Sequence, residues 1–196
     1  MDTRENILDL TFRTLLEEGY EKVSLNSLIR KSRLTKGAFY HYFQSKDELI
    51  EEVINTYLIS QIEQFARELE KGKGSTTEKL SSMAERIEII LGHLFPSGSE
   101  EQVSDFFSLL MGVARDNENI RKMEKRTAQT IITFICHIID EGKAGGAVRD
   151  EVEAKETARL IYYSVRGTMM EWALHKEGSL RERLDGTIKG FLSLIG

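Results

Sequence analysis

Proline and glycine, the residues that most strongly interrupt helices, are sparse in this sequence. Pro96 is the only proline among 196 residues, and glycines gather at a few places such as 72–74 and 142–146. Between these places, apolar residues recur three and four positions apart, which is the period of amphipathic helices. The pattern predicts an all-α protein of about nine helices. Their expected ranges are 3–18, 24–31, 35–42, 45–71, 76–94, 99–115, 118–142, 152–177 and 180–194.

Serines with the spacing of a capping box precede four of these helices. In this motif the serine side chain accepts a hydrogen bond from the amide three residues on, and a Glu or Gln there reaches back to the serine amide. Each match follows a break in the helical pattern, so the matches support one another as helix starts. The serines are Ser45, Ser75, Ser99 and Ser179.

Cysteine content and hydropathy indicate the cellular compartment of the protein. Cys136 is the only cysteine, which rules out an internal disulfide and fits a reducing compartment. The first ten residues, MDTRENILDL, lack the basic start and apolar block of a signal peptide. No apolar run has the length of a transmembrane span. We therefore expect a cytoplasmic protein without a membrane partner.

Patterns of catalytic and metal-binding residues are missing from the sequence. Cys136 and His137 are neighbours on a predicted helix, so their side chains diverge and do not form a nucleophile–base pair. The four histidines show no metal-ligand spacing, and no Gly-rich phosphate loop ending in Gly-Lys-Ser/Thr occurs. We expect no enzyme activity, no metal site and no cofactor.

Positive charge is concentrated in the first quarter of the chain. Residues 1–46 carry eight Lys or Arg and six Asp or Glu, a balance of +2, whereas residues 47–196 carry 19 and 26, a balance of −7. Residues 22–46 contain six basic side chains and no acidic one. Such a bias favours a local contact with a polyanion, although a solvated basic patch explains the charge alone equally well.

The basic region has the spacing of a helix-turn-helix. Residues 24–42 contain two short helical patterns separated by Arg33 and Leu34. Ser24 is suited to cap the first helix and Thr35 the second. We expect Leu34 to fill the gap between the two helices.

The second of these helices divides its side chains between two faces. At about 100° per residue, Phe39 and Phe43 share one side with Ala38 and Tyr42, and this side is expected to be buried. Gly37 costs a helix about 1 kcal/mol relative to alanine, so stability alone does not explain its presence. The residues expected to face outward are Lys36, Gly37, Tyr40 and His41.

Residues 3–50 resemble the N-terminal domain of the TetR family of bacterial transcriptional repressors. The resemblance is carried by TKG at 35–37, FYHYF at 39–43 and SKDEL at 45–49, after GYEKVS at 19–24. The sequence departs from the family where LT at 10–11 and IR at 29–30 replace small alanines. SRL at 32–34 also replaces the usual Ala-Gly-Val turn, and its arginine adds a possible phosphate contact.

The resemblance implies a DNA-binding domain at 1–46 and a ligand-binding and dimerisation domain at 47–196. It implies a homodimer that binds a palindromic double-stranded DNA operator and is released by a small apolar or amphipathic effector. We expect a repressor, with activation as the alternative. A helical small-molecule-binding protein without DNA function is the alternative. The implied DNA-binding residues are Ser24, Asn26, Arg33, Thr35, Lys36, Gly37, Tyr40, His41 and Lys46.

The C-terminal region is rich in methionine and aromatic residues. Such an interior favours either a drug-sized cavity or a plain core. Arg166, in an otherwise uncharged segment, is suited to pair a ligand acid or an acid across a dimer interface. Candidate ligand-binding residues are Phe65, Phe107, Met111, Phe134, Tyr162, Arg166 and Met169.

The last two predicted helices, 152–177 and 180–194, are the expected dimer interface. In the last helix, an apolar stripe is expected to require a partner unless it folds back on the core of its own chain. The stripe consists of Leu184, Ile188, Phe191 and Leu192.

Overall fold

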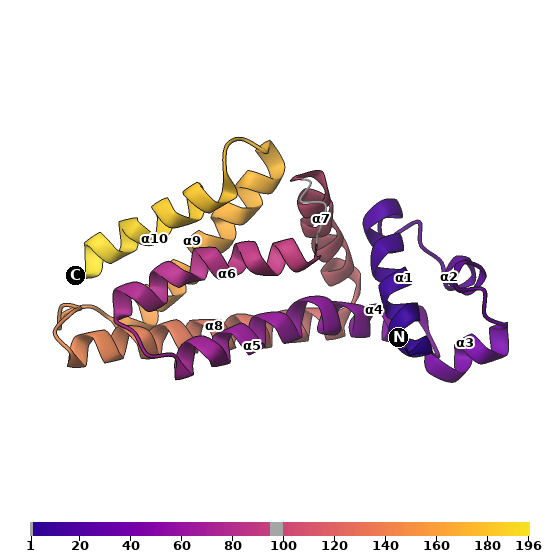
Figure 1. The fold of residues 1–196 in the computed structure, drawn as a ribbon, viewed down its shortest axis with the longest axis horizontal. Coiled ribbons are helices and arrows are strands. Elements are labelled where there is room, and N and C mark those ends of the chain that lie inside the picture. Colours follow the sequence, from indigo (N-terminus) through magenta and orange to yellow (C-terminus); the bar gives the residue numbers. More distant parts are fainter. Residues whose placement is uncertain (1, 95–99) are drawn as a thin grey trace. The chain divides into compact units, whose positions relative to one another are not determined.

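The computed structural model describes residues 2–94 and 100–196, which form helices and no strand (Figure 1). The predicted all-α class is confirmed. Residues 46–71 form one continuous helical run through α4, η1 and α5, so the described parts contain nine helical segments, as expected. The elements are α1 (Thr3–Glu18), α2 (Leu25–Ser32), α3 (Lys36–Tyr42), α4 (Lys46–Ile54), the π-helical η1 (Asn55–Ile59), α5 (Ser60–Lys71), α6 (Thr76–Leu94), α7 (Glu100–Asp116), α8 (Glu118–Ala144), α9 (Ala154–His175) and α10 (Leu180–Ile195).

Serine caps start the helices at three of the four predicted positions. Ser45 Oγ accepts from the Glu48 amide at 3.1 Å, and Ser179 Oγ accepts from the Glu182 amide at 3.3 Å. At Ser75 the capping box is reciprocal, because the Ser75 amide also donates to the Glu78 carboxylate at 2.8 Å. The hydrogen bonds that the Ser75 amide and hydroxyl donate to the Glu78 carboxylate lower the pKa of Glu78. The predicted cap at Ser99 lies outside the described residues.

The chain divides into two compact units. One comprises Met1–Ser60 and Ser104–Glu124, and the other comprises Gln61–Val103 and Lys125–Gly196. The N-terminal unit therefore includes most of α7 and the start of α8. Compactness does not define where DNA-binding function ends, so the functional boundary between residues 46 and 47 stays a prediction.

The core of the N-terminal unit is built on α1, which packs against α2 and α4. Phe12 of α1 stacks on Tyr57 of η1 with ring centres 4.6 Å apart, and it meets Phe106 of α7 edge-on at 6.2 Å. Thr11 is fully buried where the resembled family usually has a small residue, and its hydroxyl donates to the Ile7 carbonyl at 2.7 Å. The buried hydroxyl is therefore satisfied within its own helix.

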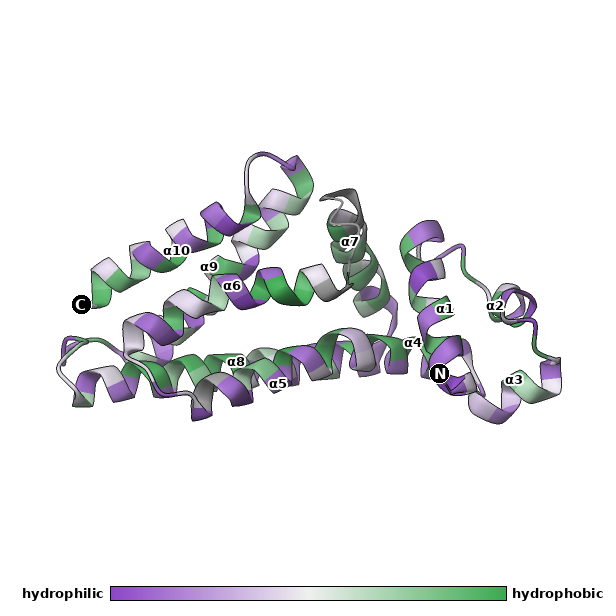
Figure 2. Ribbon diagram, in the orientation of Figure 1, coloured by the Kyte–Doolittle hydropathy of each residue, from purple (hydrophilic) through white to green (hydrophobic). Residues whose placement is uncertain are grey.

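The core of the second unit gathers residues of α5, α6, α8, α9 and α10 into one apolar cluster. Leu184 and Ile188 of α10 belong to this cluster and are 0% and 2% exposed. Figure 2 shows the matching alternation of hydrophobic and hydrophilic residues along α10. Phe191 and Leu192 are half-buried and pack against the same cluster, so the stripe of α10 packs on its own chain and is no evidence for a partner. None of the helices in the described ranges is long and apolar enough to cross a membrane.

Candidate nucleic-acid interface

The helix-turn-helix begins with a serine cap at Ser24, as predicted. Ser24 Oγ accepts from the Ser27 amide at 3.2 Å, and Ser27 Oγ accepts from the Ser24 amide at the same distance. Ser27 Oγ also donates to the Ser24 carbonyl at 2.7 Å. Ser24 and Asn26 are both exposed at the start of α2.

The turn between α2 and α3 passes through Arg33, which adopts a left-handed conformation with φ of 57°. This conformation costs little for glycine and more for other residues. The Arg33 amide donates to the Arg30 carbonyl and closes α2, while the Arg33 side chain is exposed. Leu34 is half-buried, and its expected place between the helices stays a prediction. An arginine stands here at a conformational cost that a glycine would avoid.

Helix α3 is anchored by two phenylalanines. Phe39 and Phe43 are 0% exposed, and their ring centres are 6.4 Å apart. The Arg4 guanidinium lies 5.2 Å from the Phe43 ring centre, which gives the aromatic face a cation–π contact. Thr35 caps this helix by accepting from the Ala38 amide at 3.2 Å. The predicted anchor and cap are both confirmed.

The opposite side of α3 faces solvent. Lys36, Gly37 and His41 are exposed, and Tyr40 is half-buried with the Lys36 ammonium 5.9 Å from its ring centre. Ala38 is also exposed, so its predicted place on the buried side is wrong. A helix of seven residues packs only along the line through Phe39 and Phe43, which leaves the neighbouring position open.

Gly37 has no internal reason to be glycine. A Cβ atom built there would meet no atom within 4 Å, and its backbone is in the ordinary helical region. Alanine would therefore fit and would stabilise the helix by roughly 1 kcal/mol. Neither packing nor conformation within the chain accounts for this residue.

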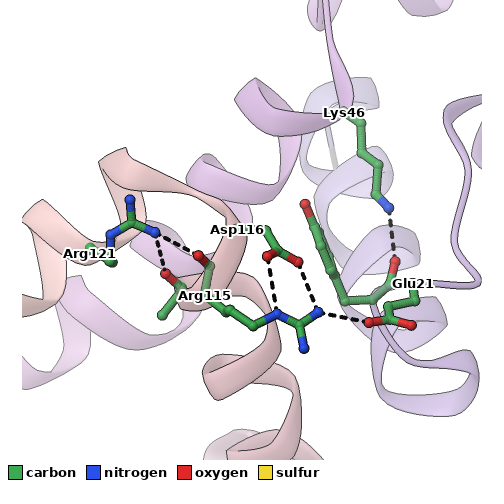
Figure 3. Close-up of polar contacts among 7 residues, drawn as sticks. Glu21, Lys46, Arg115, Asp116 and Arg121 are labelled. Carbon is green, nitrogen blue, oxygen red and sulfur yellow. Dashed lines mark hydrogen bonds and ion pairs between the residues drawn. The ribbon is translucent and has the colours of Figure 1, made fainter.

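Lys46, expected to pair with a phosphate, already has a partner in the protein (Figure 3). Its Nζ donates to the Tyr20 carbonyl at 2.8 Å and lies 4.1 Å from the centre of the Tyr20 ring. Burial lowers the pKa of Lys46, although nearby Asp47 acts in the opposite direction. Lys31, another cation of the basic region, pairs with Glu18 at 2.5 Å. Glu18 therefore balances one of the six positive charges of residues 22–46.

No pattern in the sequence indicates the hydrogen bonds that Arg115, Asn117 and Asn119 make with residues of the N-terminal unit. Arg115 of α7 donates to the Glu21 carboxylate at 2.9 Å and to the Asp116 carboxylate at 3.0 Å. Asn117 and Asn119 both donate to Glu51 of α4, at 3.1 and 3.0 Å. Residues 94 positions apart carry no local signal of such a pairing.

The candidate ligand-binding residues fall into both units. Phe65, Phe134, Tyr162 and Met169 belong to or pack against the apolar cluster of the second unit. Arg166 is half-buried and donates to the Tyr162 hydroxyl at 2.9 Å. Phe107 and Met111 lie in the N-terminal unit, and Met111 is 56% exposed. The role of all these residues in binding a ligand stays a prediction.

A comparison with protein families identifies the helix-turn-helix region. Residues 7–53, which contain α2, α3 and most of α4, match the family described as bacterial regulatory proteins, tetR family. Over these residues the chain is similar to the N-terminal domain of TetR-family regulators.

TetR-family relatives extend the similarity along most of the chain. The regulator UidR of Escherichia coli K12 is 25% identical over 194 residues, covering 97% of this chain and 93% of UidR. The repressor NemR of the same strain is 20% identical over 163 residues, covering 82% of this chain and 79% of NemR. These relatives are regulators, in agreement with the expectation that the chain is not an enzyme.

Solved TetR-family structures share the fold. The crystal structure of reduced E. coli NemR has a TM-score of 0.75 at 19% identity, covering 100% of this chain and 98% of that one. The structure of Bacillus subtilis FadR in complex with stearoyl-CoA has a TM-score of 0.77 at 16% identity, covering 98% of this chain and 99% of that one. The fold of this chain is thus found along nearly the whole length of both proteins.

Proposed function

We propose that this TetR-family protein is a cytoplasmic, ligand-responsive repressor that binds a palindromic DNA operator as a homodimer. The observation that carries the proposal is the outward face of α3, with Lys36, Gly37 and His41 exposed opposite a buried phenylalanine anchor. Glycine at position 37 lowers helix stability and answers no internal need. Close approach of the α3 backbone to the wall of a major groove accounts for it.

The proposed contacts divide into positioning and sequence reading. Phosphate contacts orient a protein on the duplex, whereas contacts to base edges select the sequence. The exposed start of α2 and the strained Arg33 suit phosphate, and the outward face of α3 suits base edges. In this proposal phosphates are contacted by Ser24, Asn26, Arg33 and Tyr40, and base edges with flanking backbone by Thr35, Lys36, Gly37 and His41.

Lys36→Ala and Tyr40→Phe are expected to weaken operator binding without unfolding the protein. Each removes a polar group from the outward side of α3 and leaves Phe39 and Phe43 in place. Removal of the Lys36 base contact costs about 1–3 kcal/mol, whereas loss of the Tyr40 phosphate contact weakens binding to all sequences alike. Affinity is measured by fluorescence anisotropy on an operator selected from genomic fragments, with helical content checked by circular dichroism.

Lys73→Ala is the matched control for Lys36→Ala, because Lys73 is an exposed lysine of the second unit. It is expected to bind like the parent. The proposed roles of Lys36 and Tyr40 fail if their variants bind the operator as tightly as the parent at the same salt concentration.

An exposed apolar line on α9 supports the proposed dimer. Leu160, Tyr163, Met170 and Leu174 are 58%, 55%, 37% and 75% exposed in the single chain. With Gly167 they follow spacings of three and four residues, the pattern of a helix–helix seam. The exposed Leu194 of α10 adds to the apolar surface of the expected interface. In a dimer, this interface would hold two recognition helices about one DNA turn apart, roughly 34–36 Å.

The apolar cluster of the second unit is the proposed effector region. Phe65, Phe134, Tyr162 and Met169 supply aromatic and thioether surface there, which suits an apolar or amphipathic molecule. Arg166, hydrogen-bonded to Tyr162, supplies a cation for an acidic group on the effector. FadR, a neighbour of the same fold, was crystallised with stearoyl-CoA, an amphipathic anion.

Release by an effector requires reciprocal coupling. We expect the operator to weaken effector binding by the same factor by which the effector weakens operator binding, about 5- to 150-fold. Calorimetric titration of an effector found by thermal-shift screening, with and without operator DNA, measures this factor. Equal effector affinities in the two titrations rule out release by this route.

A further inference from the structure

The turn that leads into α2 is held from two other helices. It spans residues 19–24, between the end of α1 and the cap of α2. Lys46, the first residue of α4, bonds the Tyr20 carbonyl at 2.8 Å and packs its ammonium 4.1 Å from the Tyr20 ring centre. Arg115 of α7 bonds the next side chain, Glu21, at 2.9 Å (Figure 3). Adjacent residues of this turn are thus hydrogen-bonded by side chains of α4 and α7.

The Arg115–Glu21 and Lys46–Tyr20 interactions differ in strength. The Arg115–Glu21 pair is 64% and 77% exposed, and exposed ion pairs contribute little to stability. The Lys46 interaction is partly buried, and it combines a charge-assisted hydrogen bond with a cation–π contact on the same residue. Lys46 is therefore the stronger of the two restraints on this turn.

The turn ends at the part of α2 that is proposed to meet phosphate. Ser24 lies four residues after Tyr20, and its hydrogen bonds with Ser27 fix the first turn of α2. The orientation of the exposed Ser24 and Asn26 therefore depends on the path of the backbone from Tyr20. A displacement at Tyr20 changes where these two side chains point without breaking the cap.

We infer that Lys46 is a positioning residue for DNA binding, which holds the 19–24 turn through Tyr20 rather than acting as a phosphate ligand. The inference rests on the proposed function. One of the three N–H donors of the Lys46 ammonium bonds the Tyr20 carbonyl, and the face of the Tyr20 ring covers part of the ammonium. Lys46 acts on the operator through the turn, because its ammonium is held against Tyr20.

Four variants separate the two roles of Lys46 by operator affinity and its salt dependence. Lys46→Met keeps the aliphatic stem and removes the ammonium, Tyr20→Leu removes the ring, and Tyr20→Phe keeps it; the double variant Lys46→Met/Tyr20→Leu completes a cycle. Each is titrated with the selected operator at several salt concentrations, after circular dichroism shows that it is folded. Lys22→Met, which removes an exposed lysine of the same turn, is the control for the change in charge.

We expect Lys46→Met to weaken binding about tenfold or more, and Tyr20→Leu to weaken it less, because the hydrogen bond to the backbone carbonyl of residue 20 remains. The double variant is expected to bind within about twofold of Lys46→Met, because Lys46→Met already removes the cation–π contact that Tyr20→Leu removes. Tyr20→Phe is expected to bind like the parent. The salt slope of Lys46→Met is expected to equal that of Lys22→Met.

Three results overturn the inference. If Lys46 binds a phosphate, Lys46→Met reduces the slope of log affinity against log salt concentration by about 0.9 for each phosphate that is no longer neutralised. This reduction would exceed any change in Lys22→Met. Multiplicative effects on affinity in the double variant, or an effect of Lys46→Met no larger than that of Lys22→Met, also exclude positioning through Tyr20. In each case the parent still binds its operator. Failure of the parent to bind any genomic duplex would instead overturn the proposed function.

Discussion

Replacement of Phe43 by alanine is expected to lower the free energy of unfolding of the N-terminal unit by about 3–5 kcal/mol. Phe43 is fully buried, its ring lies 6.4 Å from that of Phe39, and the Arg4 guanidinium covers it at 5.2 Å. Alanine would leave a cavity beneath α3 and remove the cation–π contact. The effect is large because a helix of seven residues has little other attachment.

Urea denaturation followed by circular dichroism at constant protein concentration measures this change in stability. His41→Ala is the matched control, because His41 is an exposed aromatic residue of the same helix. It is expected to stay within about 0.5 kcal/mol of the parent. An unchanged unfolding midpoint in Phe43→Ala would mean that Phe43 does not anchor α3.

Charge on the α9 line is expected to abolish the dimer and most operator binding. Leu174→Glu combined with Tyr163→Glu places two carboxylates on the proposed seam, where both side chains are more than half exposed in the single chain. Because these side chains leave the core of the chain intact, the monomer is expected to stay folded. A monomer reads one half-site, and losing the second costs about 10²- to 10⁴-fold in affinity.

Sedimentation at micromolar concentration and operator titration are the paired measurements. Lys155→Glu, an exposed change on α9 away from the Leu160–Leu174 line, is expected to leave both results unchanged. A glutamate variant that remains dimeric, or a parent that is already monomeric, contradicts the proposed interface.

The helices were predictable because their signals are local. One proline, apolar spacing and serine caps fix each helix within a few residues, and the caps at Ser45, Ser75 and Ser179 make the expected bonds. The buried side of α3 was predictable for Phe39 and Phe43, since large apolar side chains four apart define the packing line. Ala38 was wrong because a small side chain beside that line gives no signal of its own.

Interactions between distant segments were not predictable in this way. The stripe on α10 has the same pattern whether it meets its own core or a partner, and only the fold reveals that Leu184 is covered by its own chain. The lysine at 46 reads as a free cation in the sequence, whereas its bond to Tyr20 depends on how α4 meets the first turn. Arg115 lies 94 residues from Glu21, so nothing near either residue indicates their ion pair.

The central claim is that this protein binds duplex DNA with sequence preference, and one titration tests it most directly. Genomic fragments retained by the protein supply a candidate operator, and its affinity is measured against a scrambled duplex across a series of salt concentrations. The account predicts tighter binding to the operator and a logarithmic affinity that falls linearly with the logarithm of salt concentration, because phosphate contacts release counterions. Equal affinity for the two duplexes, or no binding at low salt, would contradict the account and favour a helical ligand-binding protein without DNA function.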